Sequence, residues 1–90
     1  MSAVSREVAI TNQRGLHARA SARFVNLASE LGTPIEVEKD GHRVCGTSIM
    51  GLMMLGAAMG DNIVIHVEGD GADAALEQLV ALVEERFGEE

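Results

Sequence analysis

The chain has 90 residues, of which 47% are hydrophobic and only two, both phenylalanines, are aromatic, so we expect a single domain, residues 1–90, with an aliphatic core. Its formal net charge of −7 comes without the basic face that nucleic-acid binding requires, which excludes nucleic acid as a partner. The longest mainly hydrophobic stretch, residues 49–59, is too short and too rich in glycine to span a membrane. No signal peptide is evident, and we expect a cytoplasmic monomer.

The first half of the chain predicts a strand, a helix and a β-hairpin. Hydrophobic residues of one parity indicate a first strand that ends near Thr11. Hydrophobic residues then recur at helical spacing over residues 18–31, and a glycine that can end the helix follows them. Residues 35–39 and 42–46 are expected to form antiparallel strands, because the Asp-Gly pair between them is typical of a two-residue hairpin turn.

The second half of the chain predicts a short helix, a strand and a long helix. Thr47 or Ser48 is expected to cap a helix that ends near residue 55. Residues 62–68 alternate as a strand, and residues 72–87 carry hydrophobic side chains at helical spacing. The order β-α-β-β-α-β-α places three helices on one face of a four-stranded antiparallel sheet, because crossovers are right-handed. This is an open-faced two-layer α/β sandwich, although periodicity alone also allows a ferredoxin-like strand order.

The residues that can carry chemistry gather at the predicted start of the first helix. Free backbone N–H groups and the helix dipole favour an anion there, so a phosphoryl group on the ring of His17 would meet hydrogen-bond donors. Arg19 can hold phosphate oxygens with its planar set of donors. No metal-binding partner accompanies the histidine, and from spacing alone an ordinary helix-capping role for His17 carries equal weight.

Two segments resemble motifs of a known family. Residues 15–19, Gly-Leu-His-Ala-Arg, resemble the active-site signature of HPr, the histidine phosphocarrier of the phosphoenolpyruvate-dependent phosphotransferase system. Residues 47–53 resemble that family's regulatory-serine motif. The interval between the motifs, the chain length and the order of elements also match, so the resemblance covers essentially the whole chain. It implies a sheet with strand order 1-4-2-3.

The resemblance also implies roles for particular residues. Enzyme I would phosphorylate His17 with phosphoenolpyruvate as the source, Arg19 would stabilise the phosphate, and an enzyme IIA would accept it, with no metal or other cofactor. Ser48 matches the position that HPr kinase/phosphorylase modifies, although a serine before a hydrophobic helix is most often only an N-cap. The surface that meets these partners is expected to comprise Leu16, Ala20, Arg23, Ile49, Met50 and Met53.

Other positions are less informative. Cys45 is interpreted as a small core residue, and His42 and His66 as plain surface residues. Ala20 stands where most members of the family carry proline, and since alanine is a good helix former we expect the helix to survive. The missing proline favours the nitrogen-related regulatory branch of the family, whereas the Ser48 motif favours kinase-controlled carbon metabolism.

Two other functions compete with the phosphocarrier. The first is a regulatory adaptor that acts mainly through phosphorylation of Ser48 and partner binding. Relatives of that kind lack the active histidine, whereas His17 is present. The second is an unrelated ligand-binding or structural module of ferredoxin-like type, which leaves both motifs unexplained.

Overall fold

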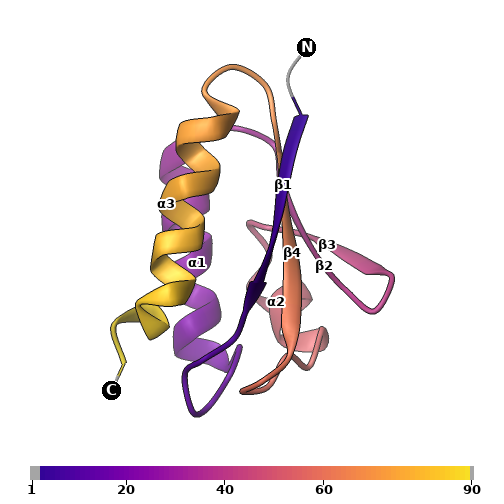
Figure 1. The fold of residues 1–90 in the computed structure, drawn as a ribbon, viewed down its shortest axis with the longest axis vertical. Helices are drawn as coiled ribbons and strands as arrows, with labels where there is room; N and C mark the ends of the chain where they lie inside the picture. The colour runs from indigo at the N-terminus through magenta and orange to yellow at the C-terminus, as the bar shows by residue number, and fades with distance from the viewer. Residues whose placement is uncertain (1–2, 90) are drawn as a thin grey trace.

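The computed structural model describes residues 3–89, so positions 1, 2 and 90 of the predicted domain lie outside it. Four strands and three helices follow one another in the predicted order, and a single-turn 3-10 helix is added at the end (Figure 1). The elements are β1 (Ala3–Ala9), α1 (Ala18–Leu31), β2 (Ile35–Lys39), β3 (His42–Cys45), α2 (Ile49–Met54), β4 (Asn62–Glu68), α3 (Ala72–Glu84) and η1 (Arg86–Gly88).

The sheet has the strand order β1-β4-β2-β3, and all neighbouring strands are antiparallel. This confirms the order 1-4-2-3 that the family resemblance implied and excludes the ferredoxin-like alternative. The hairpin between β2 and β3 turns at Asp40 and Gly41, whose φ angles of 51° and 83° are both positive, as the predicted two-residue turn requires.

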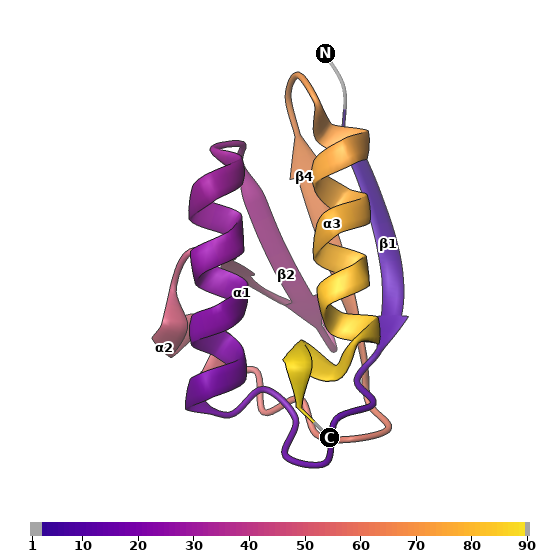
Figure 2. The ribbon, with the colours of Figure 1, turned by 90° about the vertical axis from the view of Figure 1, so that its left-hand side faces the viewer.

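The hydrophobic core lies between the sheet and the helices. Helices α1 and α3 run side by side over one face of the sheet, and the short helix α2 lies next to α1 (Figures 1 and 2). Alternate residues of β4 point into this layer, so that Ile63, Ile65 and Val67 are almost completely buried. Phe24 of α1 and Phe87 have no exposed surface, and the rest of the buried hydrophobic core is aliphatic, as the composition predicted.

The prediction that the last helix extends to residue 87 is wrong. Helix α3 ends at Glu84, because Arg86 and Phe87 adopt left-handed φ angles of 61° and 55° that interrupt the helical hydrogen bonds. The chain reverses there and brings Phe87 back onto α1, where it is fully buried. The hydrophobic residue that the helical pattern included is therefore a core residue that belongs to the next segment.

The interpretation of Cys45 as a core residue is also wrong. Cys45 pairs with Glu36 in the sheet register, so both side chains lie on the face that no helix covers. Its thiol sulfur lies 3.0 Å from Oγ1 of Thr47, and hydrogen bonding from Thr47 lowers the pKa of the thiol. On the same open face His66 is half-buried, with Nε2 2.8 Å from Oε1 of Glu38, so it is more than a plain surface residue.

Candidate functional site

His17 is the N-cap residue of α1. Its backbone is extended, with φ −77° and ψ −177°, and its Nδ1 accepts a hydrogen bond of 3.3 Å from the backbone N–H of Arg19. The capping interpretation of the sequence is therefore correct, and it is compatible with the phosphoryl-carrier interpretation. The nitrogen that caps the helix is the one that faces the free N–H groups of the first turn.

The loop before His17 is held in place from several sides. The backbone N–H of Leu16 donates to the carbonyl of Ala57 at 2.9 Å, and the hydroxyl of Ser21 donates to the carbonyl of Leu16 at 3.2 Å. Gly15 has a left-handed φ of +66°, and a Cβ atom there would lie 2.3 Å from the carbonyl oxygen of Ala57. A side chain at position 15 would therefore push the loop away from its support, which explains the glycine in the motif.

The other ring nitrogen of His17 meets a carboxylate that sequence reasoning missed. Nε2 lies 2.5 Å from Oε2 of Glu89, in the segment that follows η1, and the two side chains are 16% and 18% exposed. Oε1 of the same carboxylate accepts a hydrogen bond of 3.0 Å from the amide of Asn12, which is fully buried. No local pattern predicts this contact, because His17 and Glu89 are 72 positions apart.

The surroundings keep the Glu89 carboxyl ionised. The hydrogen bond from Asn12 lowers its pKa, burial opposes this effect, and the hydrogen bond with His17 and the positive charge of Arg14 lower the pKa further. The Asn12 amide also donates to the carbonyl of Gly15 at 2.8 Å, so one side chain holds both the loop and the carboxylate.

Of the three arginines close to His17 in the sequence, two are available to an anion. Arg14 and Arg19 are exposed, and neither has an ion-pair partner within residues 3–89. Arg23, although exposed, donates a hydrogen bond to the carbonyl of Phe87 and so ties α1 to η1. Arg19 follows the N-cap by two positions, so its guanidinium is the nearest in sequence to the ring that would carry a phosphoryl group.

The second motif forms the start of α2. Ser48 is its N-cap, and the serine hydroxyl oxygen accepts a hydrogen bond of 2.9 Å from the backbone N–H of Gly51. The helix packs against α1, and several of its hydrophobic side chains are exposed, as the sequence predicted. The exposed hydrophobic residues are Ile49, Met50, Met53 and Met54, joined by Met59 in the following loop.

Two residues of the predicted contact surface must be removed from it. Leu16 is only 5% exposed and Ala20 is fully buried, because both side chains point from the start of α1 into the core. Neither can contact a partner without unpacking. The remaining residues, Arg23, Ile49, Met50 and Met53, are all exposed, and we call them the docking surface.

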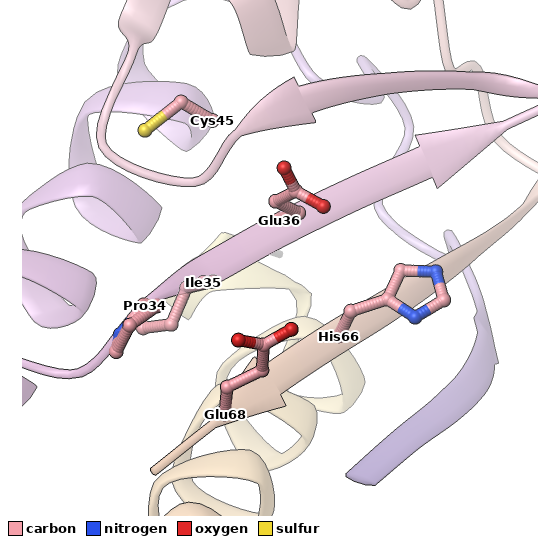
Figure 3. A pocket seen from close by; sticks show the side chains of 6 residues that line it. All are labelled: Pro34, Ile35, Glu36, Cys45, His66 and Glu68. Atoms are coloured by element: carbon pink, nitrogen blue, oxygen red, sulfur yellow. The ribbon is translucent and has the colours of Figure 1, made fainter. Parts of the chain in front are cut away.

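A separate cavity of about 250 Å³ lies on the open face of the sheet (Figure 3). It brings together Glu36 of β2, Cys45 of β3 and His66 of β4, and His17 is not among the residues that line it. Within residues 3–89, neither this cavity nor any other group of His, Cys, Asp and Glu side chains forms a metal-binding cluster. None of the helices in that range has the length and hydrophobicity to cross a membrane.

Comparison with known proteins agrees with this geometry. Residues 4–85 match the family model described as PTS HPr component phosphorylation site. The phosphocarrier protein HPr of Cupriavidus necator is 38% identical over 86 residues, which span 96% of this chain and 97% of the relative. The phosphocarrier protein NPr of Shewanella violacea is 39% identical over 89 residues, 99% of this chain and 98% of the relative. The crystal structure of HPr from Thermoanaerobacter tengcongensis superposes with a TM-score of 0.89 and 44% identity, covering 100% and 99% of the two chains.

Proposed function

This chain belongs to the HPr family of phosphotransferase-system phosphocarriers, and we propose that it accepts a phosphoryl group on His17 from phosphorylated enzyme I and passes it to an enzyme IIA. Phosphoenolpyruvate is the original source of the group. The observation that carries the proposal is the position of the His17 ring, whose Nδ1 faces the backbone N–H of Arg19 at the start of α1. The protein acts as a carrier with a phosphohistidine intermediate and is not itself an enzyme.

The geometry favours Nδ1 as the nitrogen that is phosphorylated. In the transfer step the lone pair of Nδ1 forms the new bond to phosphorus, and the bond between phosphorus and enzyme I breaks, with its electron pair staying on enzyme I. The incoming phosphoryl oxygens then lie at the N-terminus of α1, where free N–H groups and the helix dipole favour an anion. Arg19 adds an exposed guanidinium that can hold two of these oxygens. Transfer to the enzyme IIA repeats the exchange in the opposite sense.

Labelling of the protein by enzyme I and radioactive phosphoenolpyruvate tests this function. We expect an acid-labile phosphoprotein from the parent chain and none from His17→Ala. His42→Ala is the matched control, because His42 is exposed at the start of β3 and should keep full labelling. Arg19→Ala should fold normally and accept phosphate more slowly. Undiminished labelling of His17→Ala would show that another residue carries the group.

We also propose Ser48 as a site of regulatory phosphorylation by a kinase of the HPr kinase/phosphorylase type. Its hydroxyl is half-buried at the start of α2, and the next residues, Ile49 and Met50, belong to the docking surface. A phosphate there would add a charge of roughly −1.5 to −2 beside hydrophobic side chains that are expected to contact enzyme I and the enzyme IIA. The adaptor function uses Ser48 alone, so labelling of His17 by enzyme I would favour the phosphocarrier over the adaptor.

The cytoplasmic location and the monomeric state remain predictions from the sequence. We propose both for this carrier, because it must meet several soluble partners through one small surface. Size-exclusion chromatography with light scattering checks the oligomeric state, and a mass near 9.5 kDa is expected for the monomer. Acceptance of phosphate by one enzyme IIA and not by others would assign the carrier to the sugar-transport or the nitrogen-related branch.

A further inference from the structure

Glu89, in the segment after α3, lies against the His17 ring. Both oxygens of the Glu89 carboxylate are engaged, one with the amide of Asn12 at 3.0 Å and the other with Nε2 of His17 at 2.5 Å. Both side chains are largely buried, since only 16% of the His17 side chain and 18% of the Glu89 side chain is exposed. Water therefore competes less with this contact than with an ordinary surface pair.

The fold places this carboxylate through several constraints that act together. Phe87 is fully buried, and its carbonyl accepts a hydrogen bond from the guanidinium of Arg23. Gly88 has φ +77°, and a Cβ atom there would lie 2.6 Å from that guanidinium. The positive φ favours glycine at this position, and a larger residue would also displace the Arg23 guanidinium. The turn directs Glu89 toward Asn12, which is itself fixed by its hydrogen bond to Gly15.

We infer that Glu89 is a positioning residue for phosphoryl transfer. Its carboxylate fixes the tautomer of His17 that carries the proton on Nε2. The inference rests on the proposed function and goes one step further. An ionised carboxylate can only accept hydrogen bonds, so the ring nitrogen that meets Glu89 must carry the proton. A neutral imidazole has a single N–H, and Nδ1 is therefore left with its lone pair directed at the start of α1.

The same contact has a consequence after transfer. When Nδ1 forms its bond to phosphorus, the Nε2 proton stays in place and the ring becomes positively charged. The Glu89 carboxylate then faces a cation and stabilises it. Its hydrogen bond with His17 is therefore stronger in the phosphorylated carrier, since charged partners make shorter and stronger hydrogen bonds.

The tautomer can be measured without any partner protein. In long-range ¹H–¹⁵N spectra of the His17 ring, we expect the parent to show mainly the Nε2–H form at neutral pH. Glu89→Ala should show a mixture with the Nδ1–H form. Glu85→Ala is the matched control, because it removes an exposed carboxylate at the end of α3, and its spectrum should match the parent's. Glu89→Asp keeps a carboxylate and should recover part of the Nε2–H population.

The rate of transfer provides the second measurement. The maximum rate of phosphorylation by enzyme I should fall about 10- to 100-fold in Glu89→Ala, as for other groups that orient a functional imidazole, with a nearly unchanged KM because the docking surface is intact. If Glu89→Ala failed to fold, Glu89→Gln, which has nearly the same shape, would be measured instead. An unchanged tautomer population or a change confined to KM would overturn the inference. A parent chain that shows the Nε2–H form but accepts no phosphate would refute the proposed function and leave the tautomer result standing.

Discussion

Substitution of Gly15 by alanine tests whether the loop support controls both stability and transfer. The left-handed φ of +66° costs an alanine about 1–2 kcal/mol relative to glycine. The new Cβ would also lie 2.3 Å from the carbonyl oxygen of Ala57, so the backbone must move and weaken the hydrogen bond between Leu16 and Ala57, which adds about 1 kcal/mol. We expect a total loss of roughly 2–3 kcal/mol, or about 10–20 °C in melting temperature for a domain of this size.

Gly32→Ala provides the control for this substitution. Gly32 has a similar φ of +70°, but no atom lies within 4 Å of the position of its Cβ. Its substitution should therefore show the backbone cost of about 1–2 kcal/mol without the crowding. Thermal unfolding followed by circular dichroism measures both variants. Phosphorylation by enzyme I should slow about tenfold or more in Gly15→Ala, because His17 is displaced, and stay unchanged in Gly32→Ala. Equal melting temperatures and equal transfer rates in the two variants would refute the role given to Ala57.

Three further predictions concern single positions. Ala20→Pro should fold as stably as the parent and still accept phosphate, because the N–H at this third helical position has no helical partner to lose; unfolding in a thermal melt would contradict this. Phosphorylated Ser48, or Ser48→Asp, should keep or raise stability by about 0.3–1 kcal/mol and raise the KM of the carrier for enzyme I, whereas an untouched KM would place docking elsewhere. Hydrogen bonding and charge from Arg6 lower the pKa of Glu77, so this pair stabilises the fold above about pH 4.5 and loses its effect at lower pH. The difference in stability between the parent and Glu77→Gln should therefore shrink on acidification. A difference that grew would contradict the stabilising role given to the pair of Arg6 and Glu77.

Local patterns were sufficient to predict most of the fold. The spacing of hydrophobic residues gave α1 its observed bounds, and strict alternation gave β4, because both signals depend only on neighbours along the chain. The position of Cys45 could also have been found, since Val44 next to it is directed toward the core and successive strand residues point to opposite faces. The error came from considering the residue type without its place in the alternation.

Only the residues of the candidate site that are neighbours in the sequence were predicted. His17 and Arg19 are neighbours in sequence, and the start of a helix explains their chemistry without knowledge of the rest of the chain. Glu89 was missed, because it meets His17 through a reversal of the chain that depends on left-handed residues at positions 86 and 87. Asn12 was missed with it, because the role of its amide is to bind the Glu89 carboxylate. The burial of Leu16 and Ala20 was also missed, since a motif identifies positions and does not show which way their side chains point.

The place of β4 in the sheet has a consequence for how the chain folds during its synthesis. β4 is the last strand to be made, yet it lies between β1 and β2 and supplies both of them with hydrogen-bond partners. Until it emerges from the ribosome, β1 has no neighbour and β2 has only β3. Unpaired strand edges, which are prone to aggregation, are therefore expected in the nascent chain until β4 is available. We therefore expect the complete sheet to form only after β4 has been made.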